Sequence, residues 1–461
     1  MMTKAQRKAF VFTLLLGTFT MSISQSSLST AYPTLMKFFN VDAPTIQWLT
    51  TGFMLIMCIM MPVSPWLLNN LSFKKMYLTV LAIFELGTLM IILAPNFLIA
   101  LLGRGLEAVA VGILFPSYQS VLMTITAREG RAEVMGLAGL VMGSALACGP
   151  IISGIILNYI SWQGLFWFFL LVIALIFVSA IFNMRDVMER KESQLDFISV
   201  IYSLSFIGLL YFVNELGTKQ LTLPLYLILI VSVILFIAFI LRQFRVKDPL
   251  LQLRVLKVAN FDIGVLLTGF AYISLIVVTI VYPLYYQRIL HVNPLVSGLA
   301  LVPPAALLSI LNLVSGRLAD KVGFKITLLI GMVMLVVGWA ILFIFSYHLN
   351  VLGMILIACI IEGGNAFVMM PATTMGANSL PENMIPHGTA ITTTVRQLLG
   401  SLGVALAMII IVAGGHTLSE IIGYHYAFGF FCILEIVGLI LAIILRDDSK
   451  KERIEHILRP F

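Results

Sequence analysis

Residues 316–325 read Gly-Arg-Leu-Ala-Asp-Lys-Val-Gly-Phe-Lys and form a short polar segment between two long apolar stretches. An earlier segment, residues 65–74, reads Pro-Trp-Leu-Leu-Asn-Asn-Leu-Ser-Phe-Lys and matches it at Leu, Phe and Lys. The dipeptide Tyr-Pro at 32–33 recurs at 282–283, at nearly the same interval. This spacing predicts a duplicated chain whose two halves are joined by an insert, an organisation typical of transporters that rock around a central cavity.

The whole chain is strongly apolar. It has 461 residues, of which 60% are hydrophobic and 11% charged, and its mean hydropathy is +1.06. Such a composition is typical of a membrane protein. A bilayer core of roughly 30 Å needs about 20 apolar residues per helix. Fourteen segments satisfy this requirement, near 10–32, 46–68, 76–94, 97–122, 133–157, 164–182, 197–216, 222–241, 260–286, 295–315, 324–346, 350–375, 386–414 and 425–446.

These segments predict an all-α membrane protein with two pseudo-symmetric six-helix bundles and two extra helices. We expect an N-terminal bundle over 1–182, a two-helix insert over 183–259, a C-terminal bundle over 260–446 and a basic tail over 447–461.

Positive charge is distributed unevenly between the two sides predicted by this count. With both termini in the cytoplasm, 23 of the 28 Lys and Arg residues lie in cytoplasmic segments, as the positive-inside rule requires. The net charge of +7 is then explained by loops that face anionic lipid, and no nucleic-acid partner is implied. We therefore expect a multi-pass protein of a bacterial cell membrane, with both termini inside.

The metal-binding residue types give no sign of a metal site or a cofactor. The four cysteines, Cys58, Cys148, Cys359 and Cys432, all lie inside predicted spans and are interpreted as small apolar fillers. The six histidines lie mostly at helix ends or in loops, without metal-ligand spacing near a carboxylate cluster.

A few charged residues lie inside the apolar segments. One such charge costs about 2.5–3.5 kcal/mol on insertion scales, so each one needs a reason to be there. The default hypothesis is transport of protons or solutes. The residues concerned are Glu85, Arg104, Glu107, Glu362, Arg396 and Glu435.

The segment 316–325 resembles the G-x-L-A-D-x-x-G-x-K loop of the major facilitator superfamily. Most of the chain is then similar to the fourteen-span drug:proton antiporter branch of that family. The other motifs that carry the resemblance are Trp48, Arg104-Gly-Leu-Glu107, Gly139-x-x-x-Gly143, Gly149-Pro150-x-x-x-Gly154, Trp162-x-x-x-Phe166, Asp248-Pro-Leu-Leu-Gln-Leu-Arg254 and Arg396-Gln-Leu-Leu-Gly-Ser-Leu-Gly403.

Departures from the branch pattern concern the proton site. Ser24 stands where the branch carries an aspartate, and Glu107 stands where it carries a glutamine. The N-half loop has Asn69 in place of its aspartate and Ser72 in place of its glycine. We infer that the proton site has moved.

The fifth span and the polar loop are the predicted conformational elements. Gly143, Gly149 and Gly154 allow close helix approach, and Pro150 bends the helix. The resemblance implies that this seam packs against the other half; ordinary small-residue packing is the alternative. It also implies a cytoplasmic latch at Gly316, Asp320, Gly323 and Lys325, weaker in the copy with Asn69. A solvated turn is the alternative.

The predicted proton-coupling residues are Glu107 with Arg104, then Glu362, with Glu85 as a secondary candidate. Arg104 and Glu107 share a helix face, and burial and the arginine would act on the carboxyl in opposite directions. A static ion pair is the alternative there. For Glu362 the alternative is a neutral acid that bonds a neighbouring helix.

Polar, aromatic and methionine side chains are predicted to line a substrate cavity. Methionine adapts to varied shapes, and aromatic rings bind cations. Packing or lipid contact is the alternative for any single methionine. The residues are Gln25, Tyr32, Phe53, Met57, Tyr282, Tyr286, Asn312, Asn365 and Met369.

The combined prediction is a monomeric, proton-driven exporter of amphipathic, often cationic drugs and dyes, which works by alternating access in membrane lipid. Export of one specific metabolite or lipid-like compound by the same fold is the alternative. An enzyme or a receptor would need a convergent catalytic set, and the sequence suggests none.

Overall fold

The computed structural model describes residues 3–188, 190, 194–216, 222–417 and 420–445, and these form helices and connecting loops without a strand. The all-helical prediction is confirmed. The predicted tail over 447–461 lies outside the described residues. The chain clusters into two compact units, the first comprising 1–125, 141–211 and 228–251, and the second comprising 126–140, 212–227 and 252–461.

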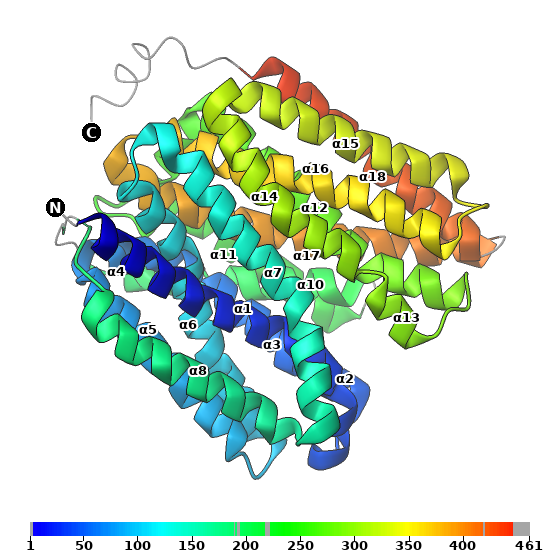
Figure 1. Ribbon diagram of the computed structural model, residues 1–461, viewed down its shortest axis with the longest axis horizontal. Helices are drawn as coiled ribbons and strands as arrows, with labels where there is room; N and C mark the ends of the chain where they lie inside the picture. Colours follow the sequence, from blue (N-terminus) through cyan, green and yellow to red (C-terminus); the bar gives the residue numbers. More distant parts are fainter. Residues whose placement is uncertain (1–2, 189, 191–193, 217–221, 418–419, 446–461) are drawn as a thin grey trace. The chain divides into compact units, whose positions relative to one another are not determined.

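The first unit contains α1 (Lys4–Phe39), α2 (Ala43–Ile46), α3 (Trp48–Met60), α4 (Ser64–Asn70), α5 (Phe73–Ile92), α6 (Phe97–Thr124), α8 (Trp162–Asn183) and α9 (Phe197–Tyr202) (Figure 1). Three helices are divided between the units: α7 (Arg131–Tyr159), α10 (Ser205–Leu216) and α11 (Leu223–Arg245). The second unit contains α12 (Ala259–Arg288), α13 (Pro294–Leu299), α14 (Val302–Val322), α15 (Phe324–Phe345), α16 (Val351–Asn378), α17 (Ile385–Thr417) and α18 (Glu420–Ile444).

The number of spanning helices differs from the sequence-based count. Thirteen helices of the described part are long and apolar enough to cross a membrane, against fourteen predicted. The fourteenth, 197–213, is a shorter apolar segment, and it is divided into α9 and α10. At this break the Ser203 hydroxyl donates to the backbone carbonyl of Val200 at 2.7 Å, a local bond that competes with the regular helix.

Two lysines at equivalent positions of the internal repeat make equivalent contacts. In the first unit the Lys74 ammonium, at the start of α5, donates to the carbonyl of Ile181 near the end of α8 at 2.5 Å. In the second unit the Lys325 ammonium, at the start of α15, donates to the carbonyl of Leu445 after α18 at 2.9 Å. Each cation thus satisfies a terminal carbonyl of a neighbouring helix.

The fourth helices of the two repeats share a register. Asn96 accepts from the amide of Ile99 at the start of α6, and Asn350 accepts from the amide of Gly353 at the start of α16. Both helices contain one internal proline, Pro116 in α6 and Pro371 in α16. These matches allow residues of one repeat to be compared with residues of the other.

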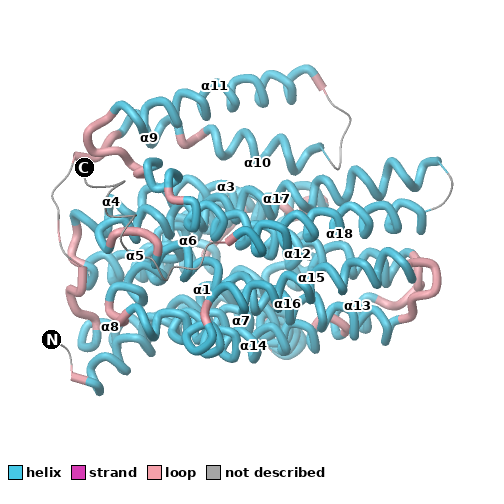
Figure 2. The backbone as a smooth tube through the Cα atoms, turned by 90° about the horizontal axis from the view of Figure 1, so that it is seen from above, coloured by secondary structure: helices cyan, strands magenta, loops and turns pink. Residues whose placement is uncertain are grey.

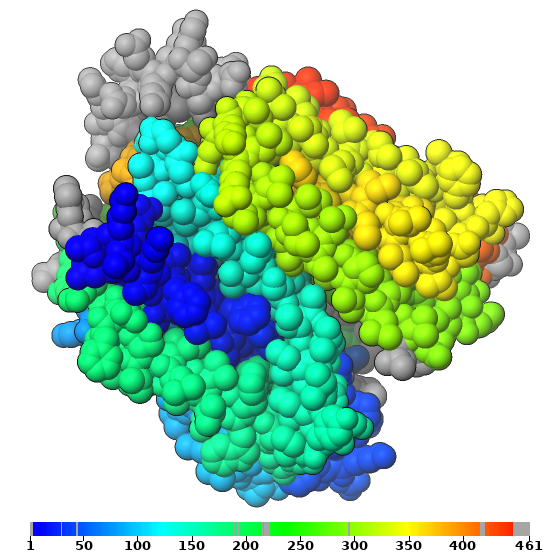
Figure 3. Space-filling view, in the orientation of Figure 1, coloured from blue at the N-terminus to red at the C-terminus, as the bar shows by residue number. Residues whose placement is uncertain are grey.

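Helix α15 shows how the sequence separates the core from the lipid-facing surface. Leu328, Met332, Leu335, Trp339 and Leu342 recur every three to four residues and are fully buried. The opposite face carries exposed aliphatic residues: Ile326, Ile330, Val333 and Val337. Figure 3 shows this helix in yellow-green at the surface of the molecule. An exposed apolar face of this kind suits hydrocarbon as the surrounding medium.

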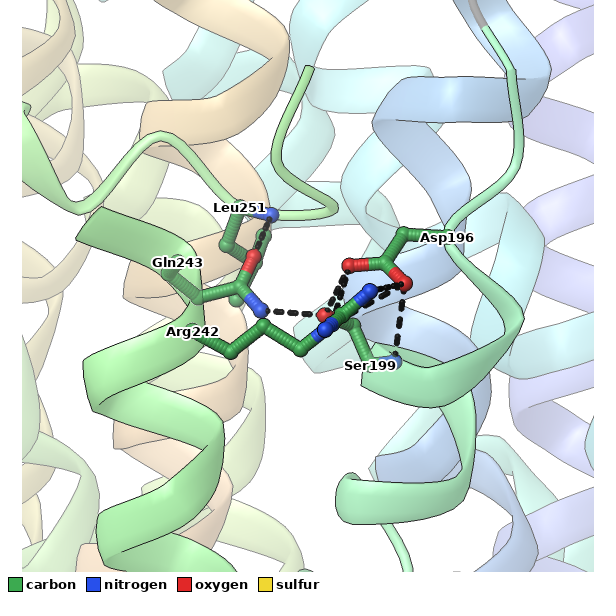
Figure 4. A network of polar contacts seen from close by, with 5 residues as sticks. All are labelled: Asp196, Ser199, Arg242, Gln243 and Leu251. Carbon is green, nitrogen blue, oxygen red and sulfur yellow. Dashed lines mark hydrogen bonds and ion pairs between the residues drawn. The ribbon is translucent and has the colours of Figure 1, made fainter. Parts of the chain in front are cut away.

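The inserted helices are joined by a polar network (Figure 4). Asp196 caps α9 by accepting from the amide of Ser199, and its carboxylate forms an ion pair with Arg242 of α11 at 2.8 Å. The Gln243 amide donates to the Ser199 hydroxyl at 2.7 Å, and the backbone amide of Leu251 donates to Gln243 at 3.0 Å. Burial alone would raise the pKa of Asp196, but the bonds from Arg242 and Ser199 outweigh it and lower that pKa below its ordinary value.

The network joins α9 to α11, and Figure 2 shows α10 and α11 side by side. Their close approach is also marked by Gly208, where an added Cβ would lie 1.8 Å from the Ser232 hydroxyl. In the first unit the ring of Tyr211 stacks on that of Trp48 of α3, with centroids 5.9 Å apart.

Candidate functional site

The first unit contains a buried ion pair between Arg104 and Glu107 of α6. The two side chains are 2% and 0% exposed, so both charges are removed from solvent. Glu107 also accepts a hydrogen bond from the Thr88 hydroxyl of α5 at 2.6 Å. The arginine and the threonine together satisfy both carboxylate oxygens of Glu107, which is the arrangement that stabilises an ionised acid in an apolar interior.

Aromatic and backbone groups complete the surroundings of Arg104. Its guanidinium lies 4.3 Å from the ring centroid of Phe53 on α3, a cation–π distance, and its Nε donates to the Leu49 carbonyl at 3.4 Å. Tyr32 of α1 lies within electrostatic range of Arg104, and its hydroxyl shares a hydrogen bond with Thr50. Three of the predicted residues, Tyr32, Phe53 and Arg104, therefore lie together.

The second unit contains a buried carboxyl of a different kind. Glu362 of α16 is 4% exposed, and its Oε2 accepts from the amide nitrogen of Asn365 at 3.1 Å. No ion pair to Glu362 is formed by any residue that the structure describes. Without a cation, an ionised Glu362 would have only the amide dipole of Asn365 to offset the loss of water.

Tyr282 of α12 lies beside Glu362, and Tyr286 lies next to Tyr282. Tyr282 and Tyr286 are fully buried, their ring centroids lie 6.0 Å apart, and Tyr282 is within electrostatic range of Glu362. Neither hydroxyl has a hydrogen-bond partner among the described residues, nor does Oδ1 of Asn365. Buried polar atoms normally have partners, so this cluster suits water or a polar group of a substrate.

The two glutamates occupy the same position in the two repeats. Glu107 precedes Pro116 of α6 by nine residues, and Glu362 precedes Pro371 of α16 by nine residues. The residues at the position of the cation differ, because Cys359 of α16 stands where α6 has Arg104. One acid is therefore neutralised by a fixed charge and its counterpart is not.

The start of α7 packs tightly on α14 within the second unit. A Cβ added at Gly136 would lie 2.4 Å from the Asn312 carbonyl, and one at Gly316 would lie 2.2 Å from the Ala132 carbonyl. A Cβ at Gly139 would lie 2.7 Å from the Asn312 side chain. These small residues bring the two backbones into contact.

The later glycines of α7 have different surroundings from the glycines at its start. Gly149 packs against α1 inside the first unit, where an added Cβ would meet the Ser26 hydroxyl at 1.9 Å. Gly154 faces open space and Pro150 is exposed, while Gly143 is buried. The expectation that Gly149 and Gly154 pack against the opposite half stays a prediction. The close approach of α7 to a C-half helix inside the second unit occurs at the start of α7.

Charged residues lie around the start of α7. Asp320 of α14 accepts hydrogen bonds from the amides of Ala132 and Glu133 at 3.2 and 2.8 Å, and so caps the helix. Arg317 forms an ion pair with Glu133 at 2.8 Å. Gly323, with φ +93°, ends α14 in a backbone conformation that favours glycine, and Lys325 follows it.

A buried arginine adds to this cluster. Arg131 is 3% exposed in its side chain, pairs with both carboxylate oxygens of Glu382 at 2.8 Å, and donates to Asn378 at 3.0 Å. Sequence reasoning counted Arg131 only as a loop charge. Arg131 is the first residue of α7, and Glu382 lies in the short turn that precedes α17.

The N-half copy of the loop has other contacts. The backbone amide of Lys74 donates to Asp186 at 3.2 Å, and Ser72 caps α5. Burial would raise the pKa of Asp186, but bonds from Lys74 and Ser72 and the charge of Arg190 lower it. Asn69 is half-buried at the end of α4.

The remaining predicted residues are dispersed. Glu85 of α5 is partly exposed, and its Oε1 has no partner among the described residues. Gln25 is half-buried on α1, and Met57 is buried on α3. Asn312 donates to the Leu308 carbonyl of its own helix, and Met369 is nearly buried on α16. These five residues do not join either glutamate cluster through a described contact.

The repeated helix pattern, the thirteen apolar spans and the buried charges agree with what sequence comparison finds. The family model of the Major Facilitator Superfamily matches residues 14–404 and 265–459. The chain is a member of the major facilitator superfamily. The prediction of that family from the loop at 316–325 is confirmed, and the chain is a helical membrane transporter.

Similar proteins of this superfamily include transporters from Bacillus subtilis (strain 168). The chain is 34% identical over 460 residues to the uncharacterized MFS-type transporter YcnB, covering 96% of each protein. It is 33% identical over 466 residues to the lincomycin resistance protein LmrB, covering 97% of this chain and 96% of that one. The solved structure of the proton:xylose symporter XylE superposes with a TM-score of 0.71 over 100% of both chains at 11% identity, which shows the shared fold.

Proposed function

We propose that this superfamily member is a proton-coupled antiporter that exports amphipathic, often cationic drugs and dyes. The similarity to a lincomycin resistance protein supports a drug as the cargo. The distribution of Lys and Arg supports a bacterial cell membrane location with both termini in the cytoplasm. We further propose that it acts as a monomer in membrane lipid.

The observation that carries the proposal is the state of Glu362. This carboxyl is buried, has no cation partner within the described residues, and is surrounded by tyrosine and asparagine atoms without hydrogen-bond partners. An acid in such a place is most stable with a proton bound, and it ionises when water or a cationic substrate reaches it. Binding of proton and of cargo to one carboxyl is then mutually exclusive, as antiport requires.

Glu107 takes a different role in this proposal. Since Arg104 and Thr88 already satisfy its oxygens, loss or gain of a proton at Glu107 would break a complete arrangement. The order of the sequence-based candidates is therefore reversed: Glu362 exchanges the proton, and Glu107 with Arg104 holds α3, α5 and α6 together. Arg104 remains available to Tyr32 and Phe53 at the edge of the cavity.

The cluster at the start of α7 supplies the conformational step. Asp320, Arg317 and Arg131 hold α7 to α14 and to the start of α17 in the state described. We propose that these bonds break and reform as the transporter alternates. For an uncharged cargo, a proton that crosses 100 mV releases about 2.3 kcal/mol, enough to support a cargo gradient of a few tens-fold; for a cationic cargo exchanged one for one, the pH difference is the driving force.

The test is transport by purified protein in liposomes. The wild-type protein is reconstituted in liposomes that contain a fluorescent cationic dye. A pH gradient is then imposed, and dye movement is recorded. Glu362→Gln should abolish dye movement driven by the pH gradient while it preserves exchange of dye down its own gradient, because glutamine cannot release a proton.

The matched control is Glu420→Gln, which removes an exposed acid of the second unit that lies outside the cluster at the start of α7. It should keep the coupling to pH. A wild-type protein whose dye gradient ignores both pH and voltage would contradict the proposed function. Full coupling in Glu362→Gln would contradict only the assignment of the carrier.

A further inference from the structure

A third buried glutamate lies in the second unit, away from the residues used above. Glu435 of α18 is 0% exposed, and its Oε1 accepts from the Ser274 hydroxyl of α12 at 2.5 Å. The Trp339 indole of α15 donates to the same Ser274 oxygen at 2.8 Å. Three helices thus meet at one carboxyl.

The direction of this chain of hydrogen bonds is fixed by chemistry. An indole N–H is a donor only, so the Ser274 oxygen accepts from Trp339. The single Ser274 hydrogen then points to Oε1 of Glu435, and it cannot serve Oε2. Oε2 is buried and has no partner among the described residues.

The charged groups on the packed helices do not neutralise this acid. On α18 the nearest titratable neighbour is the Cys432 thiol, and α15 contributes Trp339. On α17, Arg396 lies 5.1 Å over the Tyr272 ring of α12 and forms no ion pair within the described part of the chain. An ionised Glu435 would therefore leave a bare charge on Oε2 in an apolar interior.

The repeat gives this arrangement a counterpart. Trp339 follows Lys325 by the same fourteen residues by which Thr88 follows Lys74, and each is preceded by a glycine, Gly338 or Gly87. Thr88 donates to Glu107 directly, whereas Trp339 reaches Glu435 through Ser274. Equivalent positions of α5 and α15 thus direct a donor toward a buried glutamate in each repeat.

We propose that Glu435 is a second proton-binding site, which carries its proton on Oε2 while Ser274 and Trp339 hold Oε1. The proton comes from water on one side of the membrane, forms the neutral carboxylic acid, and returns to water when the packing of α12 against α18 opens. A buried acid that always stayed neutral and left one oxygen without a partner would lower the stability of the fold, and an apolar residue at this position would not.

The first part of the test does not depend on transport. Infrared spectra of the full chain in lipid, recorded across pH, should contain a carbonyl band of a protonated carboxyl that decreases at alkaline pH. Glu435→Gln should remove that component. The matched control, Glu420→Gln, changes an exposed acid at the start of the same helix and should retain it.

Two further variants keep the acid in place. Ser274→Ala and Trp339→Phe should shift the frequency of the same band, because Oε1 loses its donor or that donor loses its orientation. If Glu435→Gln fails to fold, these shifts carry the test. Identical spectra for the wild type and all three variants at every pH would overturn the proposal.

The second part rests on the proposed function, and it counts protons. The number of protons moved per dye molecule in liposomes should be lower by one in Glu435→Gln than in the wild type and in Glu420→Gln. An unchanged count would overturn exchange at this site. A wild type that moves no protons would instead overturn the proposed function and leave the infrared result standing.

Discussion

Arg104 lies one helical turn before Glu107 on α6, and the two form an ion pair from which solvent is almost fully excluded. Removal of one partner of a buried pair leaves the other charge without compensation, which costs about 3–5 kcal/mol. We therefore expect Arg104→Met and Glu107→Gln each to lower the thermal stability of the purified protein by an amount in this range.

The double variant separates the pair from its parts. With both charges absent, the loss of stability should be smaller than the sum of the single losses, as thermal unfolding of the four proteins can determine. Thr88→Val is the control, and it should cost only about 1 kcal/mol because it removes one hydrogen bond to Glu107. Additive single losses would show that the charges do not interact.

The contact between Gly316 and Ala132 predicts a position that tolerates no side chain. Gly316→Ala would place a methyl group 2.2 Å from a backbone carbonyl oxygen, so α7 and α14 must separate. We expect a loss of about 1–3 kcal/mol in stability, together with slower dye transport.

A matched glycine substitution on α7 should change the stability of the protein in the opposite direction. Gly154 faces open space within a helix, so Gly154→Ala should stabilise the protein by about 0.5–1 kcal/mol and leave transport unchanged. Both variants can be compared by thermal unfolding and by dye efflux. Equal effects at the two positions would contradict the packing described for α7.

The network around Asp196 predicts a stability that depends on acidity. Asn is as good a helix cap as Asp, so Asp196→Asn keeps the cap of α9 while it removes the ion pair with Arg242 and the bond from the Ser199 hydroxyl. We expect faster amide hydrogen exchange in α9 and α11 and a loss of about 1.5–3 kcal/mol.

The sign of the pH effect follows from the lowered pKa of Asp196. The contribution of this ion pair is complete above the ordinary carboxyl pKa of about 3.9, and it is lost as the pH falls through the lower value of the folded protein. The hydrogen exchange of the Asn variant should not show this acid transition. A control is Asp42→Asn, whose carboxylate accepts from Thr45 without a cation.

The sequence predicted the helices better than their contacts. Apolar length located thirteen spans, and the shared register of 65–74 and 316–325 predicted the repeat. The break at Ser203 escaped prediction because 197–216 is mostly apolar, and its three serines do not by themselves show where the helix is interrupted. A hydropathy pattern does not report the bond that the Ser203 hydroxyl makes.

The candidate site was predicted in part. The cost of charge in lipid singled out Arg104, Glu107 and Glu362. Their partners, such as Thr88, are common residue types on other helices, and nothing in their local sequence marks them. The same holds for Ser274 and Trp339, which meet Glu435 only after α12, α15 and α18 have packed.

The position of Trp339 makes it a natural optical reporter. Its indole is 0% exposed and hydrogen-bonded, whereas Trp48 and Trp167 are 39% and 50% exposed among the five tryptophans of the chain. Emission from Trp339 should be blue-shifted and resistant to aqueous quenchers. Trp162 is also buried, at 3% exposed, so the difference between the wild type and Trp339→Phe assigns the emission that follows events at the junction of α12, α15 and α18.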